Sequence, residues 1–527
     1  MNKVFLSYLL AICLSSVSFS QNNGYFSGSL QSTTHYYLDD KVLSTIRPLN
    51  PLASNNYLLV QYNNGPFSAS LQYEAYMPPL SGYPYQLEGN RITHRYFRFT
   101  KDVFDITVGN FYEQFGNGLI FRAFESRELG INNSLDGLRA VLRPASWLKI
   151  TGIYGKQRKY LNNSNSYLRG FDADINIDSL FKSQTGLRLG AGIMSRYELY
   201  TGTVTNFPST VNASGFRISV VRSSFEINSE YAFKTDDPTA KNLYSYVHGS
   251  SFLLNSTYTG NGFGIFFCTR FLDNMDFRGE RDSEGNYLMI NYLPSNTKQH
   301  SYLLTNIYPY STQSAAEASF QSEINCTFPK GGFAGGRYGT GIRLNFSQAR
   351  NLRVAGTTGL NILFSAGKNI YFQDINFEIT KKWSPVLKTI FTYINLKYDK
   401  GVIEGPGYDF VKADIAVADL QFRLSDYLSL RTELQHLWTR QDHGNWIAGL
   451  SEFGYAPHLT LFVSDMTDYQ YDLKKAHYLN AGIGYTMDYL RISIGYGRQR
   501  EGQICAGGIC QRVPSYKGFN LKLNVNF

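Results

Sequence analysis

The chain has 527 residues, with 50 Lys and Arg against 41 Asp and Glu, and therefore a formal net charge of +9. Its mean hydropathy is -0.27. Beyond the N-terminal segment no run reaches the roughly 18 apolar residues of a membrane-spanning helix, which excludes helical membrane proteins. The basic residues form no concentrated run, so we expect no nucleic-acid partner and assign the basic excess to a lumen or to lipid headgroups.

The N-terminal segment has the form of a secretory signal peptide. Lys3 is followed by an apolar stretch from Val4 to Phe19, and the small residues Ser18 and Ser20 favour cleavage before Gln21. We therefore expect a signal peptide over residues 1–20 and a mature chain, residues 21–527, exported to the outer membrane of a Gram-negative cell. The strand pattern begins soon after the cleavage site, which predicts no separate N-terminal plug domain.

Several segments alternate apolar and polar residues at every second position. The clearest are residues 67–77, 224–233, 428–435 and 490–497. Successive residues of a β-strand point to opposite faces. Charged residues such as Glu226 between apolar neighbours are tolerated where one face of the strand is wet, as in outer-membrane barrels. The 40 Tyr and 37 Phe, against 4 Trp, match the aromatic belts of such barrels.

Short turns alternate with long connections along the chain. The turns lie at residues 63–65, 101–102, 143–145, 260–262, 424–426 and 487–488. The long connections include residues 38–55, 79–90, 112–135, 199–213, 235–248 and 273–313. Outer-membrane barrels have short periplasmic turns and long outer loops. The order therefore predicts an all-β fold, a single transmembrane antiparallel β-barrel of about 24 strands (range about 20–26), with Phe527 on the periplasmic side.

Two segments fit this alternation less well, residues 351–367 and 410–424. In the second segment the apolar face changes near Ala418 and Asp419. A residue inserted into one strand shifts the side chains that follow to the opposite face. The pattern therefore predicts a β-bulge at this position.

A barrel of this width has an open lumen unless something fills it, because porins of about 16–18 strands already carry a channel. Residues 112–135 and 273–313 are too apolar and aromatic for solvated loops, so we expect both to fold over or into the lumen. Bidentate Arg–carboxylate pairs fix geometry well. The residues expected to form such a network are Glu113, Arg122, Glu125, Arg127, Glu128, Asp273, Asp276, Arg278 and Arg281.

The acidic residues of the second loop suggest calcium as an alternative. Asp273, Asp276, Glu280, Asp282 and Glu284 carry oxygen ligands, but their spacing differs from the Asp-x-Asp-x-Asp-Gly calcium loop. The neighbouring Arg side chains compete as ion-pair partners. We therefore expect no cofactor and no metal, with calcium as the alternative.

Cys505 and Cys510 bracket the sequence Ala-Gly-Gly-Ile in the last long connection. Export favours disulfides, and the two glycines allow a tight turn between the cysteines. No His lies near enough in sequence to suggest zinc. We predict a Cys505–Cys510 disulfide that stiffens the tip of an outer loop.

The chain ends on an alternating strand, residues 516–527, with an aromatic residue in the last position. Such an end is similar to the C-terminal signal that the barrel-assembly machinery reads. The residues of this predicted assembly signal, all on one face, are Phe519, Leu521, Leu523, Val525 and Phe527.

Four segments resemble an uncharacterised outer-membrane barrel family of Bacteroidota. They are GNFYEQFGNGLIFRAFESRELGINNSLDGLR at 109–139, FLDNMDFRGER at 271–281, INYLPSNTKQHSYLLTNIYPY at 290–310, and CAGGIC at 505–510. They are spread over most of the mature chain. The resemblance implies a barrel fold, an outer-membrane location and a bacterial group, and it transfers no catalytic or ligand residues.

For function the sequence leaves two hypotheses. The first is a transport or channel protein whose selectivity is set by lumen charges, which are Glu74, Glu226, Arg431, Glu433, Arg491 and Lys522. The second is a non-conducting structural subunit of an outer-membrane protein secretion or assembly complex. Outer-membrane lipid, the assembly machinery and other secretion-complex proteins are the expected partners. The chain contains no G-x-S-x-G, H-E-x-x-H or G-x-x-x-x-G-K motif, so we expect no enzyme.

Overall fold

The structure is a computed structural model that describes residues 24–527 except 182, 201–206, 354–363 and 471–475. The predicted signal peptide over residues 1–20 lies outside the described residues, as does most of the ambiguous stretch 351–367. In the part of the chain that is described, no helix combines the length and apolarity needed to cross a membrane.

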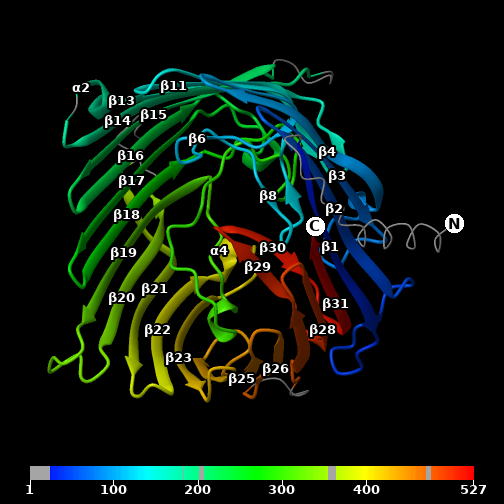
Figure 1. The fold of residues 1–527 in the computed structure, drawn as a ribbon, viewed down its shortest axis with the longest axis vertical. Helices are drawn as coiled ribbons and strands as arrows, with labels where there is room; N and C mark the ends of the chain where they lie inside the picture. The colour runs from blue at the N-terminus through cyan, green and yellow to red at the C-terminus, as the bar shows by residue number, and fades with distance from the viewer. Residues whose placement is uncertain (1–23, 182, 201–206, 354–363, 471–475) are drawn as a thin grey trace.

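The described residues form a closed antiparallel β-barrel (Figure 1). Its 24 strands are β1 (Tyr25–Leu38), β2 (Leu52–Asn64), β3 (Phe67–Tyr76), β4 (Gly89–Lys101), β5 (Phe104–Phe111), β10 (Leu135–Ala145), β11 (Leu148–Lys159), β13 (Tyr167–Asn176), β14 (Gly186–Tyr197), β15 (Thr210–Arg222), β16 (Phe225–Lys234), β17 (Gly249–Gly260), β18 (Phe263–Asp273), β19 (Ala316–Phe328), β20 (Thr340–Leu352), β21 (Ala366–Lys382), β22 (Leu387–Asp399), β23 (Phe410–Arg423), β24 (Leu428–Thr439), β25 (Trp446–Tyr455), β26 (Leu459–Asp468), β27 (Asn480–Thr486), β28 (Leu490–Gln499) and β31 (Tyr516–Asn526). The predicted all-β barrel of about 24 strands is confirmed.

Shorter elements lie in the connections. The strands are β6 (Gln114–Phe115), β7 (Phe121–Arg122), β8 (Glu125–Ser126), β9 (Ile131–Asn132), β12 (Asn162–Asn163), β29 (Gly502–Ala506) and β30 (Ile509–Val513). The helical turns are η1 (Tyr85–Leu87), α2 (Ile177–Phe181), η2 (Ala240–Asn242), η3 (Leu304–Asn306) and α4 (Lys400–Ile403).

The last strand closes the ring against the first. β31 pairs with β1 from Ser29–Asn526 to Leu38–Lys517, and with β28 on its other side. The pairing continues to the final residue, because Gly28 N donates to Phe527 O at 2.7 Å and Phe527 N donates to Gly28 O at 3.0 Å. A Cβ on Gly28 would lie 2.6 Å from the Phe527 ring, so Gly28 makes room for the terminal aromatic side chain.

The two ends of the barrel differ, as the alternation of turns and loops predicted. At one end, called the turn end, short connections join the strands at residues 65–66, 102–103, 146–147 and 261–262. At the opposite loop end, long connections span residues 112–134, 274–315 and 500–515. Both Tyr25, the start of β1, and Phe527 lie at the turn end.

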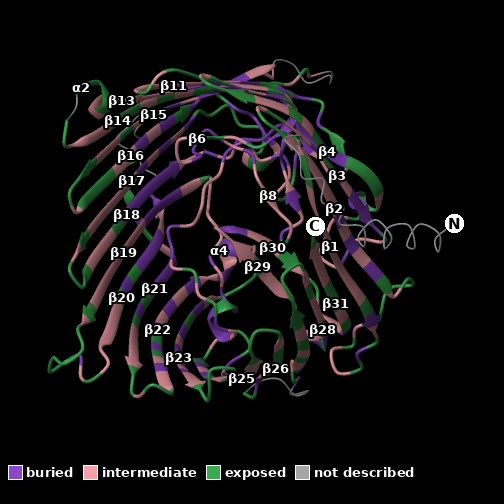
Figure 2. Ribbon diagram, viewed as in Figure 1, coloured by how far each residue is buried: buried purple, intermediate pink, exposed green. Residues whose placement is uncertain are grey.

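The barrel is apolar outside and polar inside. On β16 the outward residues Phe225, Ile227 and Phe233 are 56%, 42% and 41% exposed, whereas the inward residues Glu230 and Lys234 are buried. Exposed and buried positions alternate in the same way along many strands (Figure 2). This arrangement suits lipid around the barrel and polar contacts within it.

The predicted bulge near Ala418 and Asp419 is wrong. β23 pairs with both neighbours without a register shift. Val411, Ile415 and Val417 face inward together with Asp419, and they are buried because a long connection covers them from inside the barrel. The inner face of β23 is apolar where that connection covers it and polar further along the strand. This difference explains the apparent change of face of the apolar residues in the sequence.

Closure of the barrel predicts that the terminal residue controls assembly. Phe527→Asp, or deletion of Phe527, should lower the level of folded barrel in the outer membrane several-fold, because both backbone bonds to Gly28 and the ring contact are disturbed. Heat-modifiable mobility of the membrane fraction measures the folded barrel. Asn526→Asp, one residue earlier on the inward face, is the matched control. Equal amounts of folded barrel for Phe527→Asp and wild type would contradict the prediction.

The two faces should respond differently to charge. Ile218→Arg places a cation on the outward face in the middle of β15, where burial in hydrocarbon costs about 2–4 kcal/mol. Asn228→Arg introduces the same side chain on the inward face of β16, beside the Glu226 carboxylate and opposite Ser219 of β15. Urea unfolding of the refolded barrels should show a clear loss of stability for the first variant alone. Equal losses would show that the face assignment is incorrect.

Candidate functional site

Three connections from the loop end fold into the barrel. We name them inner loop 1 (residues 112–134), inner loop 2 (residues 274–315) and the inner hairpin (residues 500–515). Figure 1 shows β6 and β8 of inner loop 1 and the β29–β30 hairpin within the outline of the ring. The sequence indicated the first two segments, whereas the inward position of the hairpin was not expected.

Inner loop 1 packs against the wall formed by β10 to β18. Asn117 donates from its backbone N and from Nδ2 to Glu230 Oε2, at 2.7 and 2.8 Å. Glu113 Oε2 accepts a bond from Arg139 Nε at 2.6 Å. Phe115 and Ile120 are completely buried in a cluster with wall residues. Charged contacts and apolar packing together hold this loop at the wall.

Glycines in the wall make room for this packing. A Cβ on Gly170 would lie 2.8 Å from the Phe115 ring, and one on Gly192 would lie 3.3 Å from Ile120. Glycine inside a strand often marks the close approach of another segment. These glycines are the sequence signal that could have indicated which strands inner loop 1 contacts.

The expected network within inner loop 1 is formed only in part. Glu125 and Arg127 are paired at 3.3 Å, and the Arg127 guanidinium lies 4.3 Å from the centre of the Tyr57 ring. Arg122 stacks instead on the Tyr292 ring of inner loop 2, at 4.0 Å. Glu128 is exposed. The predicted carboxylate–arginine network is therefore corrected for Arg122, whose partners are aromatic rings.

The first half of inner loop 2 is held by buried ion pairs. Arg278 binds Asp276 with two bonds, at 2.7 and 3.1 Å. Arg281 is almost fully buried and donates from Nε to Glu198 Oε2 at 3.1 Å. Asp273 lies at the end of β18. Arg281 therefore binds the loop to the end of β14, whereas Arg278 pairs with a residue of the loop itself.

The acidic residues that suggested calcium point in different directions. Glu280 pairs with Lys159 of β11, and Asp282 accepts a bond from the Tyr244 hydroxyl at 2.6 Å. Within the described ranges, no group of three or more His, Cys, Asp or Glu side chains is arranged to hold a metal ion. The spacing of these carboxylates therefore serves ion pairs and hydrogen bonds.

The second half of inner loop 2 reaches strands β19 to β25. His300 Nε2 and Asp374 Oδ2 of β21 are 2.6 Å apart, and Leu304 N donates to Gln435 Oε1 of β24 at 2.9 Å. Burial, with the Asp419 carboxylate nearby, raises the pKa of Tyr302 to about 12. This phenol therefore stays protonated. Inner loop 2 thus connects two different parts of the barrel wall.

The inner hairpin joins both inner loops. The Cys505–Cys510 disulfide lies across its two paired strands. Asn286 Nδ2 donates to Cys510 O at 2.7 Å, and Thr312 N donates to Gly508 O at 3.2 Å. Ile509 is buried with residues of inner loop 1. The expected exposed outer tip is therefore corrected, because the tip packs inside the barrel.

The turn at the hairpin tip requires its two glycines. Gly507 and Gly508 have φ of 56° and 80°, a backbone region that glycine adopts without strain. A Cβ on Gly508 would lie 2.3 Å from Ser295 N of inner loop 2. Both the turn and its close contact explain the Ala-Gly-Gly-Ile sequence between the cysteines.

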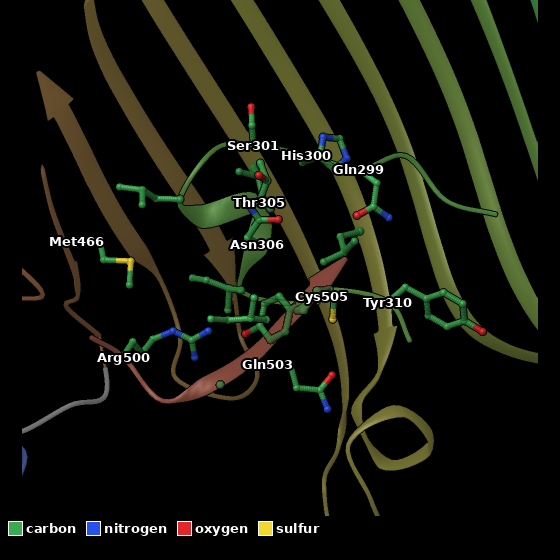
Figure 3. A pocket seen from close by; sticks show the side chains of 18 of the residues that line it. Gln299, His300, Ser301, Thr305, Asn306, Tyr310, Met466, Arg500, Gln503 and Cys505 are labelled. Atoms are coloured by element: carbon green, nitrogen blue, oxygen red, sulfur yellow. The ribbon is translucent and has the colours of Figure 1, made fainter. Parts of the chain in front are cut away.

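A cavity of about 390 Å³ remains between inner loop 2, the inner hairpin and the wall. Figure 3 shows Arg500, Gln503 and Cys505 along the hairpin segment, below the part of inner loop 2 that carries Ser301 and Asn306. A second cavity of about 340 Å³ adjoins it and shares Arg500 and Gln503 in its lining.

The predicted lumen charges fall into two groups. Glu74 is completely buried and accepts two bonds from Arg158 at 2.8 and 2.6 Å, and Arg431 pairs with Asp419 and Glu433. Glu226, Arg491 and Lys522 are exposed. Several partners, such as Arg139 and Arg158, were missed, although their positions in alternating strands place them on the inner face.

Solved structures share the barrel fold at low sequence identity. The siderophore receptor PirA from Pseudomonas aeruginosa is 10% identical, with a TM-score of 0.42, over 95% of this chain and 80% of that chain. The outer membrane transporter YddB from Escherichia coli is 9% identical, with a TM-score of 0.39, over 95% and 81%. A mutant porin from Rh. blastica is 10% identical, with a TM-score of 0.26, over 65% and 100%. These likenesses are too distant to carry function to this chain.

Among curated proteins, none matches the chain. A protein-family model does match, and it covers residues 1–527. The family has no assigned activity, in agreement with the resemblance seen in the sequence. The chain belongs to the Family of unknown function (DUF6029).

Proposed function

We propose that this protein is an outer-membrane barrel that lets small solutes cross through a restricted lumen, without catalysis. The observation that carries the proposal is the cavity of about 390 Å³ enclosed by inner loop 2, the inner hairpin and the wall. Its volume lies within the range of about 300–1,000 Å³ typical of small-molecule sites. A barrel that served only as a scaffold would need no such space beside its inner segments.

Buried ion pairs beside inner loop 2 support a fixed constriction, because Arg196 and Lys234 also donate to the Arg278 and Asp276 carbonyl oxygens of that loop. Arg196 and Asp237, 2.8 Å apart, are completely buried, and Lys234 binds the same carboxylate at 3.0 Å. Removing charges from water is expensive, and a buried pair often adds little net stability. Such pairs instead favour one position of the neighbouring loop, because any other arrangement leaves a charge buried without its partner. A constriction in a selective channel requires this kind of precision.

Removing inner loop 2 should open the barrel. Deletion of residues 276–306 with the flanking strands kept should raise single-channel conductance and sensitivity to bulky antibiotics. The deletion removes the contacts that inner loop 2 makes through Arg281 with one part of the wall and through His300 and Leu304 with the other. Deletion of residues 41–49, a largely exposed segment between β1 and β2, is the matched control and should change neither. An intact barrel that is no leakier after the first deletion would contradict the proposal. That result would favour an accessory subunit of a secretion or assembly complex.

The hairpin disulfide should stabilise the constriction. Cys505→Ser combined with Cys510→Ser removes the cross-link across the hairpin that binds both inner loops. The cysteines are separated by 5 residues in sequence. The loss of stability should therefore be smaller than the roughly 3 kcal/mol that a disulfide closing a 15-residue loop contributes. We expect more frequent conductance fluctuations, with only this small loss of stability. Planar-bilayer recordings with and without a reductant measure them.

The remaining cysteines provide the control for that experiment. Cys326→Ser replaces a half-buried free thiol on β19, away from the hairpin, and should leave the recordings unchanged. If the double hairpin variant and reduced wild-type protein show the same steady current as oxidised wild type, the hairpin does not limit motion in the lumen.

A further inference from the structure

The larger of the two adjoining cavities, of about 390 Å³, has a lining that is basic and, among the described residues, contains no carboxylate. Its basic residues are Lys298, His300, Arg498 and Arg500, three tyrosines and the disulfide-bonded Cys505 also line it, and none of the described Asp or Glu side chains does. Three of these basic side chains pair with carboxylates that do not line the cavity. Lys298 lies 3.7 Å from Glu323, His300 binds Asp374, and Arg498 binds Asp40.

Arg500 differs from the other three bases. Its guanidinium makes no hydrogen bond and no ion pair within the described part of the chain, and it lies 5.9 Å from the centre of the Trp446 ring. Arg500 lines both the larger cavity and the adjoining one. An arginine carries five N–H donors in a planar fork that matches a carboxylate. The cavity therefore presents an unused binding group for an anion.

A second unused donor lies beside Arg500. Trp446 is 1% exposed, and its Nε1 has no hydrogen-bond partner. Trp446 lines the adjoining cavity, which shares Arg500 with the larger one. A buried donor without a partner costs free energy. The adjoining cavity is also lined by Glu404, Asp442, Asp468 and Glu501. These carboxylates disfavour an anion on that side, so an acidic solute would approach the Arg500 guanidinium from the larger cavity.

The remaining lining is apolar or neutral. Aliphatic side chains from inner loop 2 and from the wall contribute one part of it, and they are Leu303, Ile307, Ile394, Leu396, Ile415 and Met466. Neutral polar side chains such as Asn306 and Gln503 contribute another part (Figure 3). A simple inorganic anion would leave the aliphatic surface without a contact.

We propose that this cavity binds a small organic anion, with its acidic group at Arg500 and its apolar part against Leu396, Ile415 and Met466. This inference names the class of solute for the proposed function. Its relevance to transport rests on that function. Binding itself does not depend on conduction. The site can therefore be tested on the isolated barrel.

Calorimetric titration of the full-length barrel in nanodiscs tests the site, with phenylacetate as the probe and the neutral phenylacetamide as its match in shape. Because its carboxylate makes one additional charged hydrogen bond, phenylacetate should bind about tenfold more tightly than phenylacetamide. Sulfate, which lacks the apolar part, should bind more weakly than phenylacetate. Arg500→Gln should remove the preference for phenylacetate, and Arg500→Lys should retain part of it.

Arg222→Gln is the matched control, because Arg222 is an exposed residue at the turn end of β15 and lies outside the cavity lining, and it should leave binding unchanged. Equal affinity for the acid and the amide, no binding of phenylacetate, or unchanged binding by Arg500→Gln would overturn the proposal. Liposome flux of wild-type protein separates it from the proposed function. Binding without flux retains the site and rejects transport, whereas flux without binding rejects the site alone.

Discussion

Closure of the hydrogen-bonded ring is the constraint on which the rest of the structure depends. A backbone N–H or C=O group in lipid without a partner is costly, so a sheet can cross a membrane only as a closed barrel. Here the last strand completes the ring, down to the reciprocal bonds between Gly28 and Phe527. Because 24 strands enclose a wide interior, closure creates a lumen that the chain must then fill. The three inner segments are the consequence of that width.

The inner segments show how a polar lumen can hold a loop in one position. The inward faces of the strands provide charged side chains, and the loops provide partners, as in Glu230 with Asn117 or Arg139 with Glu113. Apolar packing fills the space between these contacts, for example where Phe115 and Ile120 lie against wall glycines. Apolar packing holds the loops against the wall. The charged contacts select one position of each loop, because any other position would leave a buried charge without a partner.

The sequence was sufficient to predict the strands and their two faces. It was insufficient to predict which loop residue each inward side chain contacts. Alternation is a local property, so Phe225 and Glu226 already indicate the faces of β16. The contact between Glu230 and Asn117 joins residues 113 positions apart, and no local pattern contains it. β23 was misread for a related reason, because Val411 to Val417 are apolar toward the lumen under inner loop 2. The inward position of the hairpin likewise depends on Tyr292 and Ser295, which lie some two hundred residues earlier.

The same reasoning explains why Arg500, a half-buried arginine with no carboxylate partner among the described residues, is informative in this barrel. Elsewhere in the lumen, buried cations have a carboxylate within bonding distance, as with Arg158 and Glu74 or Arg270 and Glu317. Around the larger cavity, Lys298, His300 and Arg498 pair with carboxylates that do not line it, and no described carboxylate faces it. The carboxylates near Arg500 line the adjoining cavity instead. An arginine placed at that surface attracts an anion more strongly than it would in water, because the low local dielectric weakens screening. The charge pattern therefore favours acidic solutes at the point where the inner segments narrow the lumen.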